Sequence, residues 1–179
     1  MSPKPEFSRP YRVDTLGAQP RPVSIGADEE ERRALAARFR LQGIQRLAAE
    51  ASLARKGEAV EASGTVFASV TQSCVATGEP VEEEVEEAFR IEFRPHLQTD
   101  GPDEEIELSG GELDVVFYDG AAVDLGEAVA ETLSLSLNPY PRSPAAEAAL
   151  REAGVKSEEE ARAESSPFAA LQALKDKMK

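Results

Sequence analysis

The feature that most constrains the fold is an alternation of side-chain character with a period of two residues, which begins at Val60. Successive side chains of a strand point to opposite faces, so this period predicts a strand with one apolar face. That face comprises Val60, Ala62, Gly64, Val66, Ala68 and Val70. A second run also fits a helix as far as Ala88, but Phe89, Ile91 and Phe93 favour a strand. Gly78 and Pro80 lie between the runs and suit a turn, so the pattern predicts a long antiparallel hairpin.

A helix is predicted to begin after Asp28, before the hairpin. Asp28 can cap this helix, and Glu31 at the third helical position completes a capping-box pattern. Leu35 and Phe39 then lie at helical spacing on one face. Gly43 is expected to end or kink this helix. The following segment contains Ile44, Leu47 and Leu53 and fits either a helix or a strand, of which we favour the strand.

Further elements are predicted after the hairpin. Asp124, with Glu127 three residues later, predicts the start of a second helix. Its apolar face is expected to comprise Leu125, Ala128, Val129, Thr132 and Leu133, extended by Leu135 and Leu137. Residues 138–141 (Asn-Pro-Tyr-Pro) are expected to end the helix. Short strands are expected at Ile106–Leu108 and Leu113–Phe117, with an Asp119-Gly120 hairpin turn after them. A last helix is expected over Phe168 to Lys177.

The predicted fold class is α+β: an antiparallel sheet built from hairpins, with helices packed against it and a flexible N-terminal arm. The length of 179 residues fits one domain with tails. We expect residues 1–23 to be the proline-bearing arm, which could contain a first strand around Tyr11 to Leu16. Residues 24–141 and 165–177 are predicted to form a single domain. Residues 142–164 are rich in alanine and glutamate and are expected to form a mobile helical segment.

Charge is strongly segregated along the chain. Residues 58–139 carry twenty acidic residues and two basic ones, although the whole chain has a net charge of −14. An acidic surface repels phosphate and attracts basic proteins. The chain has one cysteine, Cys74, and one histidine, His96, too few for a zinc site of the thiolate and imidazole type. No apolar run reaches the roughly 20 residues that span a membrane, and no secretory signal is evident, so we expect a cytoplasmic protein without a cofactor.

The candidate site residues fall into three groups. Those expected to contact a protein partner are Thr77, Glu79, Pro80, Glu82, Glu84, Glu86, Asp124, Glu127 and Glu131. The arginines of the first helix, which could contact phosphate, are Arg32, Arg33, Arg38 and Arg40, with Arg46 beyond it. Cys74 could be a reactive thiol, but a small, partly buried residue at a strand end is the favoured interpretation.

Each group also has a simpler explanation. Asp124, Glu127 and Glu131 share one side of a helix and could act as acid and base or hold magnesium, but capping explains the first two. Glu82, Glu84 and Glu86 could be a solvated or charge-protected strand, since charges at a strand edge discourage aggregation. The arginines could simply solvate their helix. The turn at residues 77–80 needs no role beyond reversing the chain.

Three stretches, in this order and spacing, resemble the bacterial YceD family, the large ribosomal RNA subunit accumulation proteins. They are Val70 to Val81, Asp124 to Leu133 continuing through Pro141, and Ser166 to Lys175. The similarity extends over about Ser24 to Lys177. It implies a cytoplasmic factor for accumulation of large-subunit ribosomal RNA and implies no catalytic activity. Many relatives carry a second cysteine where this chain has Thr77, so a metal site of those relatives is expected to be absent here.

Together, these patterns lead us to expect a non-enzymatic factor in large ribosomal subunit biogenesis. Its partners would be basic proteins, such as ribosomal proteins or an enzyme that processes ribosomal RNA, bound through the acidic surface. The alternative is direct RNA binding through the arginine-bearing helix. A magnesium-dependent nuclease using Asp124 and Glu131 is the least favoured interpretation.

Overall fold

The computed structural model describes residues 5–96 and 114–156, which divide into two compact units. The sheet unit comprises residues 1–72 and 82–139. The turn unit comprises residues 73–81 and 140–179. The predicted strand at Ile106–Leu108 and the predicted helix from Phe168 lie outside the described residues.

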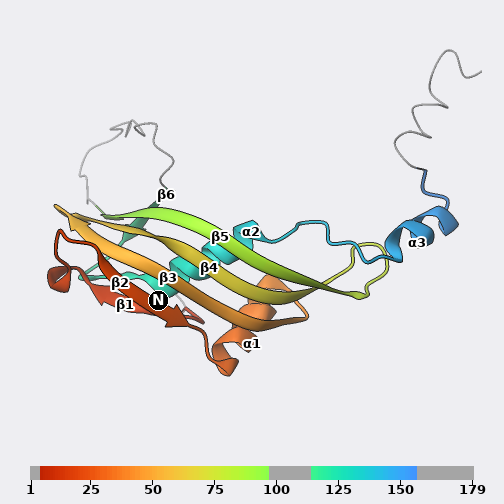
Figure 1. The fold of residues 1–179 in the computed structure, drawn as a ribbon, viewed down its shortest axis with the longest axis horizontal. Helices are drawn as coiled ribbons and strands as arrows, with labels where there is room; N and C mark the ends of the chain where they lie inside the picture. The colour runs from red at the N-terminus through yellow and green to blue at the C-terminus, as the bar shows by residue number, and fades with distance from the viewer. Residues whose placement is uncertain (1–4, 97–113, 157–179) are drawn as a thin grey trace, which may run out of the picture. The chain divides into compact units, whose positions relative to one another are not determined.

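The sheet unit is built on a five-stranded sheet in the order β2-β3-β4-β5-β6 (Figure 1). The strand bounds are Arg21–Gly26 for β2, Gly43–Lys56 for β3, Ala59–Ser73 for β4, Pro80–Pro95 for β5 and Asp114–Tyr118 for β6. Antiparallel pairing joins β2 to β3 and β3 to β4. The connection from β4 to β5 is too short for a parallel crossover, so this neighbouring pair is the predicted antiparallel hairpin.

The sheet is mixed rather than wholly antiparallel, because β6 pairs with β5 in parallel, from Ile91 opposite Asp114 to Pro95 opposite Tyr118. The α+β class is confirmed, but the prediction of a purely hairpin-built antiparallel sheet is wrong at this edge. A parallel neighbour needs a long connection, and the connection here runs through residues 97–113. Local patterns of hydrophobicity do not indicate which edge strand the chain pairs with after such a connection, or in which direction.

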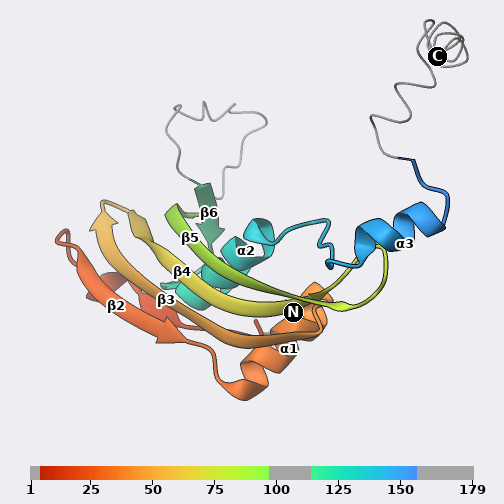
Figure 2. The ribbon, with the colours of Figure 1, turned by 45° about the vertical axis from the view of Figure 1, so that its right-hand side comes forward.

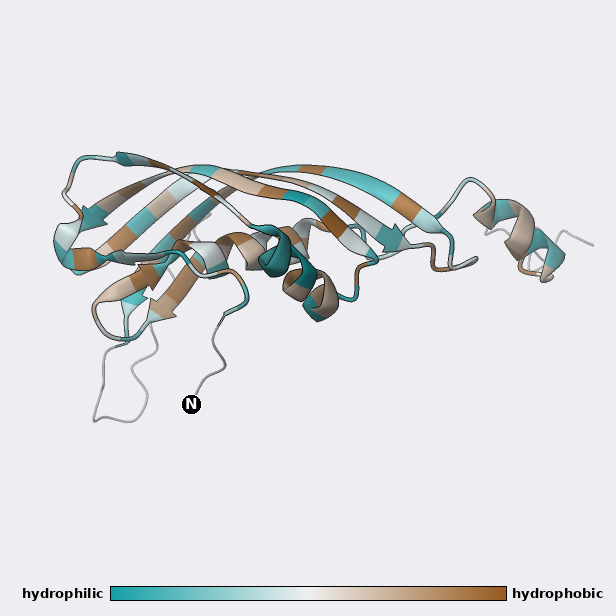
Figure 3. Cartoon of the chain, turned by 90° about the horizontal axis from the view of Figure 1, so that it is seen from below, coloured by the Kyte–Doolittle hydropathy of each residue, from teal (hydrophilic) through white to brown (hydrophobic). Residues whose placement is uncertain are grey.

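The predicted alternation is confirmed in the long strands. Val60, Ala62 and Val66 in β4 are each 0 % exposed, and Phe93 in β5 is 2 % exposed. Apolar and polar residues therefore alternate along the strands, as the brown and teal bands in Figure 3 show. The buried strand residues share one hydrophobic core with Leu35 and with buried residues of the second helix. Both helices therefore pack against the same face of the sheet.

Helix α1 (Glu29–Phe39) begins as predicted. The Asp28 carboxylate accepts a hydrogen bond from the Glu31 backbone, and the Glu31 side chain accepts one from the Asp28 backbone. The helix ends earlier than predicted, since Arg40 adopts a left-handed conformation with φ of 56°. Gly43 is instead the first residue of β3, and the segment after it is the strand that we favoured.

The N-terminal residues do not form a free arm. Strand β1 (Pro10–Arg12) pairs antiparallel with β7 (Ala122–Asp124), and the 3-10 helix η1 (Val13–Thr15) follows β1. Phe7 is 0 % exposed in the core. Figure 2 shows β2 at the edge of the sheet, where it pairs with β3. The prediction of a flexible arm over residues 1–23 is therefore wrong for the described part from Phe7 onward, because its strand partners lie far along the chain.

Gly120 has φ of 84° and lies in the turn after β6, but this turn does not close a hairpin. The strand that follows it, β7, pairs with β1 instead of β6. The prediction of a hairpin at Asp119-Gly120 is therefore wrong. A turn signal indicates that the chain reverses, and it does not indicate which strand the next segment joins.

Helix α2 (Leu125–Ser136) follows β7 directly. Leu125 and Leu133 are 0 % exposed, as predicted, whereas Leu135 is 86 % exposed and does not belong to the buried face. In the turn unit, α3 (Ala146–Glu152) confirms helical structure in part of the predicted alanine- and glutamate-rich segment. The proposed single domain over 24–141 and 165–177 stays a prediction, since residues 165–177 are not described.

Candidate functional site

Three glutamates follow one another along the solvent side of β5. Glu82, Glu84 and Glu86 are all exposed, whereas Val85 between them is 8 % exposed and faces the core. The Glu84 carboxylate accepts a hydrogen bond of 2.5 Å from the Ser69 hydroxyl on β4. We call Glu82, Glu84 and Glu86 the β5 glutamate row. Side chains two residues apart lie on the same side of a strand, so these three carboxylates concentrate negative charge there.

The basic residues of β5 do not neutralise this row. Arg90 pairs with Glu61 on β4 at 3.1 Å, and Lys56 on β3 also pairs with Glu61. Arg94 pairs with Glu92 at 2.9 Å on its own strand. The two arginines of β5 are therefore matched by other carboxylates. The β5 glutamate row keeps its charge, which suits contact with a cationic surface.

The Asp124 carboxylate is used within the fold, where it holds the start of α2 in place. Its carboxylate accepts hydrogen bonds from the Ser8 hydroxyl at 2.5 Å and from the Arg9 backbone N–H at 2.7 Å. It also accepts from the backbone N–H groups of Gly126 at 3.0 Å and Glu127 at 3.3 Å. The predicted cap is thus confirmed, and the same carboxylate fastens the N-terminal segment to the helix. A carboxylate with four donors has little capacity left for a partner or a metal ion.

Glu127 is also used within the fold. It accepts hydrogen bonds from two guanidinium nitrogens of Arg38, at 2.8 and 3.1 Å, and Arg38 pairs with Glu6 at 2.9 Å as well. The hydrogen bond to Glu127 contributes most to raising the pKa of Arg38. Glu131 is exposed, and partial desolvation followed by the charge of Glu127 raises its pKa. The three predicted α2 carboxylates therefore differ, and Glu131 is the one open to solvent.

The arginines of α1 are largely engaged in local contacts. Arg32 donates to the Ala27 carbonyl at 2.8 Å, and Arg33 pairs with Glu29 at 2.8 Å. Arg40 is exposed at the end of the helix. The guanidinium of Arg46 on β3 lies 5.9 Å from the centre of the Phe67 ring. The arginines are thus not gathered into one phosphate-binding surface.

The turn unit contains a compact hydrogen-bonded cluster, which we call the turn cluster (Cys74, Thr77, Glu79 and Ser143). The Ser143 hydroxyl donates to Glu79 at 2.6 Å and lies 3.2 Å from the Thr77 hydroxyl, which itself lies 3.1 Å from Glu79. The Cys74 backbone N–H donates to the Glu79 carbonyl at 2.7 Å, which closes the turn. Hydrogen bonds from Ser143 and then Thr77 lower the pKa of Glu79. Pro80, predicted with this group, is exposed at the start of β5.

The thiol of Cys74 lies within this cluster and the residue is 3 % exposed. The backbone N–H of Ser143, with further help from the Thr77 hydroxyl, lowers the pKa of Cys74 to about 6. Hydrogen bonds to a thiolate favour its charged form. Cys74 directly follows β4, at the predicted strand end, and it is more fully buried than predicted. Among residues 5–96 and 114–156, no group of three or more histidine, cysteine or acidic residues is arranged to hold a metal ion.

Sequence reasoning missed the residues whose partners lie far along the chain. Ser143 is 7 % exposed and meets Thr77 across 66 positions. Glu83 faces away from the β5 glutamate row and accepts hydrogen bonds from the Gln72 side chain at 2.6 Å and the Asn138 backbone at 3.3 Å. For Glu83 the sequence did contain a signal, because the two-residue period of β5 predicts that its side chain points to the face opposite Glu82, Glu84 and Glu86. The only sequence signal at Ser143 is its position after the Asn-Pro-Tyr-Pro segment, which does not indicate a contact.

Comparison with known proteins identifies the family. The family model described as large ribosomal RNA subunit accumulation protein YceD matches residues 62–175. This range includes the β5 glutamate row, α2 and the turn cluster. No curated protein and no solved structure matches the chain. Within the described part of the chain, the helices are too short or too polar to cross a membrane. The chain belongs to the YceD family of large ribosomal RNA subunit accumulation proteins.

Proposed function

We propose that this protein is a non-enzymatic cytoplasmic factor in large ribosomal subunit biogenesis and acts through contacts with basic proteins. Its family is named for accumulation of large-subunit ribosomal RNA. The observation that carries the mechanism is the β5 glutamate row, three exposed carboxylates on a strand whose own arginines, Arg90 and Arg94, are paired with other carboxylates. Ribosomal proteins and enzymes that process ribosomal RNA are the partners that this charge suits.

The contacts of Asp124 favour a non-enzymatic role. A magnesium-dependent nuclease would need Asp124 and Glu131 to bind the metal or a water molecule. The Asp124 carboxylate instead accepts hydrogen bonds from Ser8, Arg9 and two backbone N–H groups of α2. Freeing it would release both the helix cap and the N-terminal segment. The protein is therefore proposed to position other molecules and not to cleave RNA.

Direct RNA binding is the second candidate, and the arginine contacts disfavour it. Arg38 is held between Glu6 and Glu127, and Arg33 is paired with Glu29. A phosphate would have to displace these carboxylates. An RNA strand near α1 would also meet the negative charge of Glu30, which is exposed in its first turn. We therefore place RNA contact, where it occurs, on exposed arginines such as Arg40 and Arg46.

The proposed function is tested in a bacterial strain that lacks its own copy of this protein. The strain is complemented with the wild type or with a triple variant, Glu82→Lys, Glu84→Lys and Glu86→Lys. The control variant, Glu50→Lys, Glu58→Lys and Glu152→Lys, makes the same change in net charge at exposed positions outside β5. The measured quantity is the ratio of large-subunit to small-subunit ribosomal RNA.

We expect the wild type and the control variant to restore the ratio and the row variant to leave it low. If the wild type does not alter the ratio, the proposed role in accumulation of large-subunit RNA is wrong. If the row variant restores the ratio fully, the role stands, but the proposed acidic docking surface does not.

A further inference from the structure

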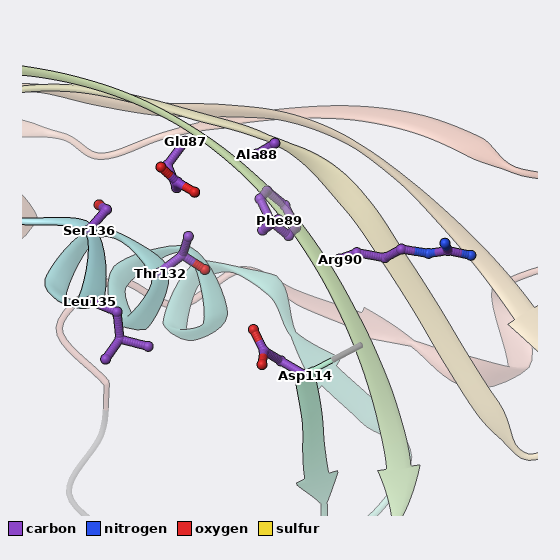
Figure 4. Close-up of a pocket in the computed structure, with 8 residues that line it drawn as sticks. All are labelled: Glu87, Ala88, Phe89, Arg90, Asp114, Thr132, Leu135 and Ser136. Atoms are coloured by element: carbon purple, nitrogen blue, oxygen red, sulfur yellow. The ribbon is translucent and has the colours of Figure 1, made fainter. Parts of the chain in front are cut away.

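A groove lies between β5 and α2 in the sheet unit (Figure 4). Glu87, which lines it, is an odd-numbered residue of β5 and so points to the face opposite the even-numbered β5 glutamate row. Its volume is about 530 Å³, and its lining includes Glu87, Phe89 and Asp114 from the strands and Thr132, Leu135 and Ser136 from the helix. The groove lies where the β6 pairing begins, since β6 covers β5 only from Ile91 to Pro95. Its size is within the range of sites that take one or a few side chains.

The groove offers apolar surface. Phe89 lines it and is itself 7 % exposed, whereas Leu135 lines the helix side and is 86 % exposed. A single exposed leucine is common on soluble proteins. Here the exposed Leu135 and the Phe89 ring line the same groove. Such an arrangement can accept an apolar side chain of a partner. Covering Leu135 would remove its apolar surface from water and so stabilise the bound state.

The groove is also negatively charged. Glu87 and Asp114 contribute carboxylates from β5 and β6, and both residues are exposed. Neither carboxylate accepts a hydrogen bond from a residue in the ranges 5–96 and 114–156 or forms an ion pair with one. Arg90 borders the groove through its stem, but its guanidinium points away in Figure 4 and pairs with Glu61 at 3.1 Å. The charge that faces an occupant is therefore that of the two carboxylates.

Charge also argues against other occupants. Residues 97–113 adjoin Asp114 in sequence but carry six acidic residues and no basic ones. A second copy of the chain would bring its own net charge of −14. A nucleic acid would bring phosphates, which the carboxylates repel. Each of these occupants would add negative charge to a site that already has an excess of it.

We propose that the groove between β5 and α2 binds a lysine- or arginine-rich segment of a partner protein, with an apolar side chain seated between Phe89 and Leu135. The cationic side chains of this segment pair with Glu87 and Asp114. This inference rests on the proposed function, and it specifies where and how the basic partner docks. It adds a second contact surface, because Glu87 and the β5 glutamate row lie on opposite faces of the same strand.

The test uses the purified full-length protein and a fluorescently labelled peptide of lysine and leucine. A control peptide carries serine in place of each leucine at the same charge. Binding is measured by fluorescence anisotropy for the wild type, Glu87→Gln, Asp114→Asn and Leu135→Ser. The matched control is Glu50→Gln, which removes the same charge at an exposed position of β3, outside both the groove and the β5 glutamate row. All four altered side chains are exposed, so the variants are expected to fold.

We expect Glu87→Gln and Leu135→Ser each to raise the Kd for the leucine peptide about five- to tenfold. Glu50→Gln should change it less than about twofold, and Leu135→Ser should not affect the serine peptide. Equal effects of Glu50→Gln and Glu87→Gln would mean diffuse attraction and overturn the proposal. An unchanged Kd for Leu135→Ser would also overturn it, as would a wild-type dimer that dissociates in Leu135→Ser.

The complementation experiment separates this inference from the proposed function. If Glu87→Gln with Leu135→Ser restores the ribosomal RNA ratio while the β5 glutamate row variant does not, the groove has no role and the proposed function stands. If the groove variant alone lowers the ratio, the basic partner docks in the groove as proposed.

Discussion

At the scale of single residues, Arg38 joins parts of the chain that are distant in sequence. It extends from α1 to Glu6 near the N-terminus and to Glu127 on α2, at 2.9 and 2.8 Å, with a side chain 34 % exposed. Its guanidinium also lies 5.4 Å from the centre of the Phe39 ring. The sequence suggested a phosphate contact here, but the structure uses the charge to hold α1, α2 and the N-terminal segment together.

Arg38→Ala should therefore lower the free energy of unfolding by about 1–2 kcal/mol, because it removes two partly screened ion pairs and leaves Glu6 and Glu127 without their cation. The control is Arg33→Ala on the same helix, whose side chain is 74 % exposed in an i,i+4 pair with Glu29. Arg33→Ala should lower the free energy of unfolding by less than about 0.5 kcal/mol. Urea unfolding measures both values, and equal losses would show that Arg38 has no joining role.

Cys74 is the other residue whose chemistry the fold changes. Its pKa of about 6 lies below the value of about 8.5 for a free cysteine. The folded state thus favours the thiolate, so Cys74 adds stability that is complete above about pH 8.5. This contribution is lost as the pH falls through about 6.

A titration of the thiolate absorbance should give a midpoint near pH 6 in the folded protein. In denaturant the midpoint should be near pH 8.5, the ordinary value. Ser143→Ala removes one hydroxyl donor but keeps the backbone N–H, so its midpoint should rise only part of the way. In parallel, the stability difference between wild type and Cys74→Ser should increase from pH 6 upward. A folded-state midpoint near 8.5 would contradict the proposed hydrogen bonding.

At the scale of elements, the first turn of α2 packs directly against the backbone of the segment before β1. A Cβ added at Gly126 would lie 2.6 Å from the Phe7 carbonyl oxygen and 2.9 Å from the Arg9 nitrogen. The Leu125 backbone N–H donates to the Arg9 carbonyl at 3.2 Å in the same place. The helix can therefore approach the N-terminal segment this closely only because residue 126 has no side chain.

Gly126→Ala should destabilise the protein by about 2 kcal/mol, because backbone atoms of Phe7 and Arg9 must move. It should also increase hydrogen exchange at Arg9, whose N–H is held by Asp124. Gly17→Ala is the control, since a Cβ there meets no atom closer than 3.9 Å. An alanine at 126 that leaves both stability and exchange unchanged would show that the N-terminal segment does not pack on α2.

The elements also show how far the sequence determined the fold. The period of two predicted β4 and β5 with the correct inward residues, and the capping patterns predicted both helix starts, since these signals are local. The parallel β5–β6 pair and the β1–β7 pair were not predictable in this way. Their partners are far apart in sequence, and Tyr11 or Val115 offers no local sign of them. For the same reason the candidate residues named from the sequence follow local patterns, such as the β5 glutamate row and the turn at Thr77 and Glu79, whereas Ser143 and the groove at Glu87 were missed.

At the scale of the whole molecule, the excess negative charge between residues 58 and 139 becomes a set of distinct surfaces. Asp124, Glu127 and Glu61 are used in internal contacts. The β5 glutamate row and the groove carboxylates Glu87 and Asp114 face solvent on opposite sides of the sheet edge. A protein that acts on ribosomal RNA through such surfaces is expected to reach the RNA by way of basic proteins.

The most direct test of this account is the co-sedimentation of the purified protein with large-subunit precursor particles over a range of salt concentrations. We expect wild-type binding to weaken steadily as salt rises, because exposed charges are screened. The variant with Glu82, Glu84 and Glu86 changed to lysine should not co-sediment at any salt concentration, whereas Arg40→Glu with Arg46→Glu should bind like the wild type. Normal co-sedimentation of the glutamate variant, together with loss of binding in the arginine variant, would contradict the account and indicate direct contact with RNA.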